Sequence, residues 1–340
     1  MDYPSDSPAG IRHIAHQAGV STATVSRVLN GSARVSEGTR ARVMQAISQH
    51  NYRPNAAAKA LATRRTRTVA AVIPTLEHSI FAMFMNVLED ELAAAGYNLV
   101  IATHRFDYQT ELKRCSDVLH LGAEAVIVSG AEHNPALLSL MRDARIPCVY
   151  TSVHAPDSEV PTYGYDNRAL AVRAVQYLAD LGHRRIAVIH GPTDVNDRMR
   201  LRVAGALDGA RANPAIDLMT IEATIGAQGG AEQLAQWAKS DALPDACLCF
   251  ADVYALGILQ EAQRLGIQIP HDMSVMGFEN LDWTANSFPR LTCMSLPTVD
   301  MGKATAASIV GHLDQNLPLS HQLFEAEIVE RASTQRLNAP

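Results

Sequence analysis

Short polar side chains and one arginine follow one another between residues 21 and 30, where they could read DNA. Residues 22–29 predict a short helix that begins after Ser21, a favourable N-cap, and shows Arg27 outward. Two short helices crossed through a tight turn fit the spacing of Ala15, Gly19 and Val25. Such a helix fits the major groove, with its N-terminal side chains on base edges. A small helical hairpin with no role in DNA binding is the alternative.

Three arginines at alternating positions, Arg198, Arg200 and Arg202, form a second group with chemical potential. Arginine binds carboxylates and phosphates bidentately, so this segment could hold an anionic ligand. Surface or salt-bridge roles are the alternative for Arg198 and Arg200.

Motifs of enzymes and of metal sites are missing from the sequence. It contains neither GxGxxG nor GxxxxGK[ST], and His190-Gly191-Pro192 is too weak a signal for a phosphate loop. Cys247 and Cys249 lack the CxxC spacing and have no His/Cys cluster as partner, so zinc is not expected. No nucleophile–base pair is visible. We therefore predict no enzyme, no catalytic residue, no metal and no cofactor apart from a small-molecule effector.

Charge is distributed unequally along the chain. The 340 residues are 47% hydrophobic and 19% charged, which suits two or three globular domains. Residues 1–67 carry ten Lys and Arg against three Asp and Glu, a net of +7, so the rest carries −13 of the total −6. A basic head on an acidic body favours a polyanionic partner for the head. With no apolar run near the roughly 20 residues of a membrane span and no signal-peptide core, we expect a cytoplasmic protein without a membrane partner.

A third helix and a linker complete the basic head. Residues 35–40 open a helix whose apolar stripe includes Val43 and Ile47. In residues 52–62, Pro54 and Asn55 form a helix start signal before a run of alanines. An isolated helix of about eight residues is marginal in water, so we expect this one to form with DNA or a partner helix.

From Thr68 onward the pattern changes to buried strands that alternate with helices. The apolar runs that predict strands are 69–74, 99–102, 125–130, 146–150, 185–191, 246–252 and 273–278. Such runs indicate a parallel sheet covered on both faces, and the restart at Arg185 favours two lobes with a cleft at the strand ends. The predicted fold class is α/β: a three-helix helix-turn-helix head and a hinge helix, then two doubly wound parallel-sheet lobes.

The segments VSTATVSRVLNGSARVSEGTRARV and NYRPNAAAKALA resemble the lactose-repressor (LacI/GalR) family of bacterial transcription regulators, and the likeness covers nearly the whole chain. It implies a sugar- or nucleobase-binding sensor of periplasmic-binding-protein-like fold, whose chain crosses between lobes three times, near residues 166, 295 and 325. The expected domains are the head at 10–54, the hinge helix and linker at 55–67, an N-terminal lobe of 68–166 and 295–325, and a C-terminal lobe of 167–294 and 326–336.

The resemblance places DNA contacts in the head and the hinge. It implies that Thr22 and Ala23 lie in the major groove and select the operator, and that Arg27 also reaches the DNA. Leu61 is then wedged into the minor groove by paired hinge helices and kinks the duplex; a helix-packing role is the alternative for this leucine. The other candidate DNA contacts are Ser21, Thr24, Ser26, Asn30, Asn55 and Ala58.

An effector site in the cleft is also implied by the resemblance. Arg202 matches the family arginine that holds the effector, Asp252 an acid at the cleft mouth, and Phe81 an aromatic that stacks on the ligand. Glu279 departs from the family Asp, which lengthens the carboxylate arm by one methylene. Phe81 in the core and Asp252 as a helix N-cap are the alternatives. Residues 73–82 resemble the gluconate-responsive branch, so a sugar acid is the leading effector and a neutral sugar the next.

Together these observations predict a transcriptional repressor that binds palindromic operator DNA as a homodimer. A small-molecule effector, a sugar or sugar acid between the lobes, is expected to release the DNA. Residues 331–340 lack a leucine-heptad extension, which favours a dimer over a tetramer. The alternatives are an α/β sugar-metabolising enzyme and a transport-type sugar-binding protein, neither of which accounts for the basic head.

Overall fold

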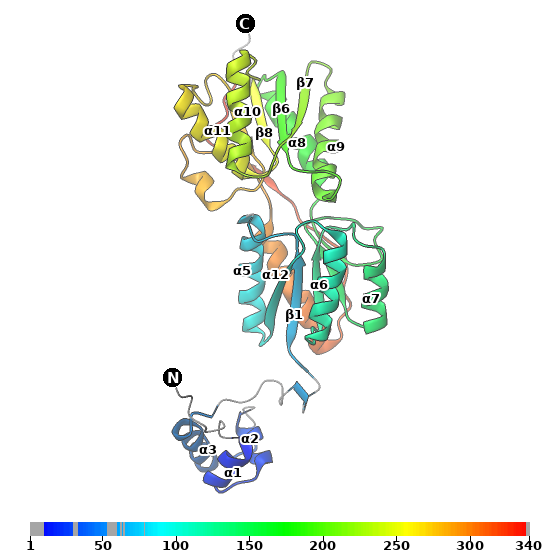
Figure 1. Cartoon of the computed structure of the whole chain (residues 1–340), viewed down its shortest axis with the longest axis vertical. Helices are drawn as coiled ribbons and strands as arrows, with labels where there is room; N and C mark the ends of the chain where they lie inside the picture. Colours follow the sequence, from blue (N-terminus) through cyan, green and yellow to red (C-terminus); the bar gives the residue numbers. More distant parts are fainter. Residues whose placement is uncertain are drawn as a thin grey trace. The chain divides into compact units, whose positions relative to one another are not determined.

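The chain forms two compact units, Met1–Thr66 and Arg67–Pro340, in a computed structural model (Figure 1). The structure describes residues 10–29, 33–52, 60–61, 63, 65–77 and 79–337. Most of the expected hinge helix, including Asn55 and Ala58, lies outside the described residues, as does Asn30.

The first unit contains three short helices: α1 (Ile11–Gln17), α2 (Thr22–Leu29) and α3 (Glu37–Gln49). Gly19 has φ +63°, the left-handed conformation that the turn between α1 and α2 requires. Ser36 caps α3, because its hydroxyl accepts the backbone N–H of Thr39. Ile14, Val25 and Val43 are fully buried where the three helices meet. The predicted three-helix head is confirmed.

The second unit consists of two lobes, each built on a six-stranded sheet. The N-terminal lobe has the strand order β11-β5-β4-β3-β1-β2, with β1 (Thr68–Ile73), β2 (Asn98–Thr103), β3 (Ala125–Ser129), β4 (Cys148–Thr151), β5 (Thr162–Gly164) and β11 (Gln322–Leu323). The C-terminal lobe has the order β12-β10-β9-β8-β6-β7, with β6 (Arg185–His190), β7 (Asp217–Glu222), β8 (Ala246–Cys249), β9 (Ser274–Gly277), β10 (Thr292–Ser295) and β12 (Glu327–Val329). The strands pair in parallel, except that β12 runs antiparallel to β10.

Helices cover both faces of each sheet (Figure 1). In the N-terminal lobe these helices are α5 (Ser79–Ala94) and α12 (Thr298–Gln315) on one face, and α6 (Tyr108–His120) and α7 (Ala136–Ala144) on the other. In the C-terminal lobe they are α8 (Asn167–Asp180) and α9 (Asp197–Ala212) on one face, and α10 (Ala227–Ser240) and α11 (Asp252–Leu265) on the other. A 3₁₀ helix, η1 (Asp282–Ala285), precedes β10. Successive side chains of a strand point to opposite faces of the sheet: Val69 and Ile73 pack toward α5, whereas Ala70 and Val72 pack toward α6.

The chain passes between the two lobes three times. It leaves the first sheet after β5, returns between β10 and α12, and leaves again between β11 and β12. The crossings expected near residues 166, 295 and 325 lie in or directly beside the segments that join these elements. All three covalent connections lie at the junction of the two lobes, so the segments beside them lie close together.

Neither a membrane-spanning helix nor a disulfide bond is found among the described residues. None of the helices that the structure describes combines the length and apolar character of a membrane span. The five cysteines are free; four are buried, and Cys148 is half-buried.

Candidate functional site

The outer face of α2 in the head carries the side chains expected to read DNA. Val25 and Val28 are buried against the other two helices, which leaves Thr22, Ala23 and Arg27 exposed. The hydroxyl of Ser21 accepts the N–H of Thr24 at 3.1 Å, so the predicted N-cap is confirmed. Thr24 and Ser26 are half-buried beside this exposed face.

Beyond the head, the structure describes Leu61 as an exposed side chain. It is 83% exposed, an unusual state for a large aliphatic residue and one in which it packs on no protein core. A leucine held in solvent is available for insertion between base pairs. Whether a hinge helix presents it stays a prediction, because the neighbouring residues lie outside the described ones.

A cavity lies where the two lobes meet in the second unit. The N-terminal lobe lines it with α5, α12 and the loop after β2, and the C-terminal lobe lines it with α9 and the segments after β8 and β9. Three of the four effector residues expected from sequence lie in this wall: Phe81, Arg202 and Glu279. Asp252 does not line the cavity.

Arg202 is buried at the C-terminal wall and is held from three directions. Its Nε donates to Oδ1 of Asn167 at 2.9 Å, and its Nη1 donates to the carbonyl oxygen of Phe250 at 2.9 Å. The guanidinium carbon also lies 4.6 Å from the centre of the Phe278 ring, a cation–π contact. These partners are neutral, so they fix the position of the guanidinium without cancelling its charge. Arg202 is therefore both a part of the wall and a part of the core.

Asp252, at the start of α11, holds the turn that carries Glu279. Its Oδ1 accepts the backbone N–H groups of Phe278 at 2.8 Å and Glu279 at 3.1 Å, and its Oδ2 accepts that of Leu281 at 2.9 Å. In return, Oε2 of Glu279 accepts the N–H of Asp252 at 3.1 Å. With its oxygens directed at backbone groups, Asp252 positions the turn beside the cavity.

Burial governs the charge of Glu279. Loss of hydration, with the Asp252 carboxyl close by, raises the pKa of Glu279 from 4.5 to about 8, although nearby Arg202 acts in the opposite direction. Burial therefore favours the protonated form of this carboxyl. A protonated carboxyl both donates and accepts a hydrogen bond and leaves the charge of Arg202 unopposed.

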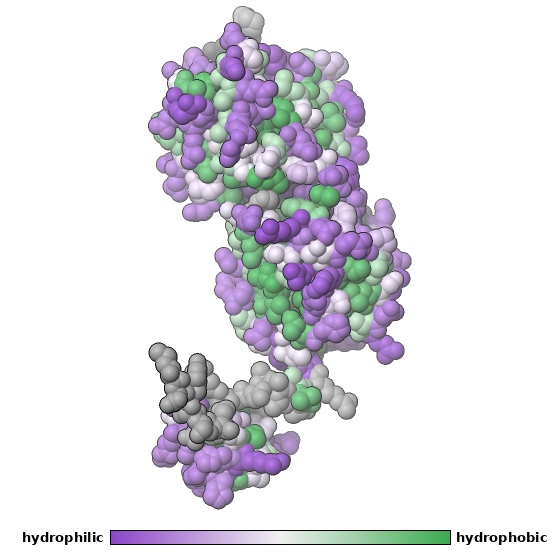
Figure 2. Space-filling model, viewed as in Figure 1, coloured by the Kyte–Doolittle hydropathy of each residue, from purple (hydrophilic) through white to green (hydrophobic). Residues whose placement is uncertain are grey.

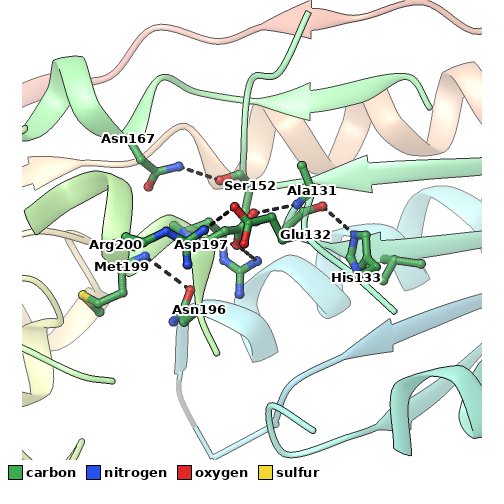
Figure 3. A network of polar contacts seen from close by, with 12 residues as sticks. Ala131, Glu132, His133, Ser152, Asn167, Asn196, Asp197, Met199 and Arg200 are labelled. Atoms are coloured by element: carbon green, nitrogen blue, oxygen red, sulfur yellow. Dashed lines mark hydrogen bonds and ion pairs between the residues drawn. The ribbon is translucent and has the colours of Figure 1, made fainter. Parts of the chain in front are cut away.

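Side chains at the start of α9 join the two lobes beside the cavity (Figure 3). Oδ2 of Asp197 accepts the backbone N–H of Ala131, which follows β3 in the other lobe, at 2.7 Å. Arg200 forms an ion pair with Glu132 of that same segment. We call these two contacts the interlobe latch. Arg200 therefore lies in the latch and not in the cavity wall.

Two neighbours adjust the latch. Arg198 donates from Nη1 to Oδ1 of Asp197 at 2.9 Å, and it lines the cavity as well. Gly130 has φ +97°, and a Cβ there would stand 2.0 Å from Nη1 of Arg198, so only glycine fits under this pair. A second link between the lobes runs through Asn167, whose Nδ2 donates to the carbonyl oxygen of Ser152 at 2.9 Å (Figure 3).

Several wall residues were not selected from the sequence as effector contacts. These are Ile80, Phe84, Phe106, Ser152, Tyr165, Asn196, Arg198, Met199, Ile225, Phe250, Ala251, Thr298 and Met301. Arg198 was named only as one of three arginines that could hold an anion; its position four residues before Arg202, on the same face of the helix, is the signal that separates it from Arg200. The others come from segments far apart in the chain, and no local pattern brings them together. Within the described parts of the chain, no cluster of three or more His, Cys, Asp or Glu is arranged to hold a metal ion.

Comparison with known proteins follows the same division into head and body. Residues 10–55 match the model of bacterial regulatory proteins, lacI family, and residues 175–334 match a periplasmic binding protein-like domain. The HTH-type transcriptional regulator RegA of Clostridium acetobutylicum is 30% identical over 331 residues, which are 96% of this chain and 99% of that protein. Catabolite control protein A of Priestia megaterium is 27% identical over 307 residues, 90% of this chain and 92% of that protein.

A solved structure shows the same fold. The Lac repressor dimer bound to operator and the anti-inducer ONPF has a TM-score of 0.86 over 97% of this chain and 100% of its own, at 23% identity. The two named relatives are regulators and not enzymes. The chain belongs to the lacI family of bacterial regulatory proteins and is a DNA-binding transcriptional regulator.

Proposed function

We propose that this chain is a repressor that binds a palindromic operator as a homodimer and releases it when a small organic anion occupies the interlobe cavity. The observation that supports control by an effector is the cavity between the lobes with buried Arg202 in its wall. The proposal places the protein in the cytoplasm, where it has access to DNA.

Binding as a dimer follows from the small size of the head. Three short helices bury a core too small to supply much binding energy or stability alone. Two heads related by two-fold symmetry bind two half-sites at once, and the operator then mirrors that symmetry. The exposed Leu61 suits a minor-groove wedge at the centre of the site, where a flexible pyrimidine–purine step favours kinking.

An anionic effector is supported by the arginines at the wall. Arg198 and Arg202 both line the cavity, and guanidinium groups bind carboxylates and phosphates with paired hydrogen bonds. The sugar acid expected from the sequence is one such anion. Membership of the gluconate-responsive branch remains a proposal that rests on residues 73–82 alone.

Control of DNA binding follows from the position of the cavity between two moving parts. A ligand that contacts Arg202 acts on Asn167, which contacts the other lobe through Ser152, and the latch lies beside it. The N-terminal lobe begins at β1, directly after the basic linker, so rotation of this lobe is transmitted along the chain to the hinge. An allosteric coupling of about 1–3 kcal/mol changes operator affinity roughly 5- to 150-fold, and DNA must change effector affinity by the same factor.

The first experiment selects bound DNA from a random pool with the full-length protein. We expect an inverted repeat with a pyrimidine–purine step, such as CG, at its centre. Enrichment of a single asymmetric half-site would contradict binding as a symmetric dimer. The selected operator then serves in fluorescence anisotropy titrations with and without small organic acids, where release of DNA is the expected response and tighter binding would indicate co-repression.

A further inference from the structure

The wall of the interlobe cavity is more apolar than is expected for a site that binds a ligand with many hydroxyl groups. The visible surface of both lobes mixes hydrophilic and hydrophobic residues (Figure 2), whereas aromatic rings and aliphatic chains make up half of the cavity wall. Four of these side chains are phenylalanines: Phe81, Phe84, Phe106 and Phe250. They come from both lobes, because α5 and the loop after β2 face the segment after β8. Aromatic side chains on two sides favour a flat ring between them.

Seven of the sixteen wall residues carry a polar side chain, and the two arginines among them are already bonded to protein partners. Arg202 donates to Asn167 and to Phe250, and Arg198 donates to Asp197. A sugar acid would bring a hydroxyl on almost every carbon, and each hydroxyl needs a partner when it is withdrawn from water.

Two polar side chains of the wall are the best placed for a ligand of mixed polar and apolar character. Thr298, at the start of α12, is 2% exposed, and its Oγ1 has no hydrogen-bond partner among the described residues. Arg202 is bonded only to neutral acceptors in the contacts described above, and burial raises the pKa of Glu279, the one carboxyl among the wall residues. A buried, uncompensated cation favours an anionic ligand. The cavity therefore offers a site for a negative charge and a site for a hydrogen bond in a wall most of whose residues are apolar.

We propose that the effector is an aromatic carboxylate, whose ring lies among the phenylalanines from the two lobes and whose carboxylate pairs with Arg202. Thr298 supplies a hydrogen bond to a polar substituent. This inference rests on the proposed function, because it names the class of anion that occupies the proposed effector cavity. Compared with the sugar acid expected from the sequence, the proposed effector has an apolar ring in place of the polyol and the same carboxylate.

The test measures ligand binding to the full-length protein without DNA, by thermal shift and isothermal titration calorimetry. The probes are benzoate, 4-hydroxybenzoate and 4-hydroxycinnamate, each paired with its primary amide, together with D-gluconate and D-galacturonate. We expect the aromatic acids to bind, the amides to bind roughly tenfold more weakly or worse because the charged hydrogen bond is lost, and the sugar acids to give no shift. Tighter binding of a sugar acid, equal binding of the amides, or no binding of any aromatic acid at millimolar concentration overturns the proposal.

Matched variants locate the binding site. Phe81→Ala should weaken binding of the aromatic acids about tenfold or more through lost apolar contact, whereas Phe288→Ala, which removes a ring that is 96% exposed and outside the wall, should leave it unchanged. Thr298→Val should weaken 4-hydroxybenzoate without lowering the Tm of the free protein, since its hydroxyl has no partner to lose. Equal effects of the two phenylalanine variants would place the ligand elsewhere.

The outcome is separable from that of the proposed function. Operator binding by the effector-free protein is measured independently, so its failure would refute the repressor proposal and leave these ligand results standing. Binding of a sugar acid in the same cavity would refute the aromatic class alone.

Discussion

Asp197→Asn tests whether the interlobe latch holds the closed arrangement of the lobes. The carboxylate is 6% exposed and joins α9 of one lobe to the segment after β3 of the other. The change keeps the size of the side chain but removes its charge. Oδ2 then becomes an amide nitrogen or an uncharged oxygen facing the N–H of Ala131, and the ion pair with Arg198 is lost.

The magnitude follows from the kind of hydrogen bond and from its burial. A hydrogen bond to a charged group contributes about 1.5–3 kcal/mol, which corresponds to roughly a 10- to 150-fold shift in the equilibrium between closed and open lobes. The second contact of the latch supplies a matched control. Arg200 and Glu132 are 41% and 57% exposed, so Glu132→Gln should cost less than about 1 kcal/mol, or roughly fivefold.

Amide hydrogen exchange of Ala131 in the full-length protein measures the opening directly. We expect exchange at this amide to accelerate by the larger factor in Asp197→Asn and by the smaller one in Glu132→Gln, while core amides of β1 keep their protection. Effector affinity should fall in parallel, because a ligand enclosed by two lobes selects the closed state. Unchanged exchange in Asp197→Asn, or equal acceleration in both variants, would refute the latch.

Further predictions concern the DNA contacts and the buried carboxyls. Leu61→Ala should weaken specific operator binding by a few kcal/mol at fixed salt, measured by anisotropy, because the wedge and its kink are lost. Thr22→Val should instead change which base pairs are preferred in a competition assay, since a base-edge contact carries sequence information. Asp252→Ala should lower the free energy of unfolding in urea by about 3 kcal/mol or more, because three buried N–H groups lose their acceptor at about 1 kcal/mol or more each. Between pH 4.5 and about 8 the contribution of Glu279 to stability should fall as pH rises, because the folded protein keeps a proton that the unfolded chain releases; the difference in stability between the wild-type protein and Glu279→Gln should follow this dependence.

Local motifs made the head predictable from the sequence. The expected bounds of the second helix, residues 22–29, coincide with α2, because a capping hydroxyl starts the helix and two buried valines fix its orientation. The third helix begins one residue after Ser36 for the same reason. Each of these signals lies within a few residues of the structure that it determines.

In the body, most of the fully buried strands were recognised, whereas β2 was predicted although it is half-exposed and β10 was missed although it is buried. β1, β3, β6, β8 and β9 are almost wholly buried and read as continuous apolar runs. The strand β7 was not predicted: it is an edge strand in which every residue is half-buried or exposed, and the charged residues Asp217 and Glu222 begin and end it. The short strands β5, β11 and β12 pair with segments far away in the chain, and two or three residues carry no periodic signal of their own.

The cavity wall divides into a part that the sequence could reveal and a part that it could not. Helical periodicity separates Arg198 and Arg202, four residues apart on the cavity face, from Arg200, which a rotation of about 200° directs into the latch. Asp252 shows the opposite case: its position after a strand suggests a ligand group, yet the three N–H groups that hold it come from a turn about 26 residues later.

The prediction of the effector shows the same contrast between signals within one segment and contacts that form only when distant segments meet. Arginines on one helix predict an anion from a single segment, and this is the half of the sugar-acid prediction that the wall supports. The body of the ligand is specified by rings from α5, from the loop after β2 and from the segment after β8, and by the buried hydroxyl of Thr298. These groups become neighbours only because the chain passes between the two lobes three times. A sequence motif near one strand end can therefore indicate the charge of the effector, whereas the apolar or polar character of its body is decided by contacts between lobes.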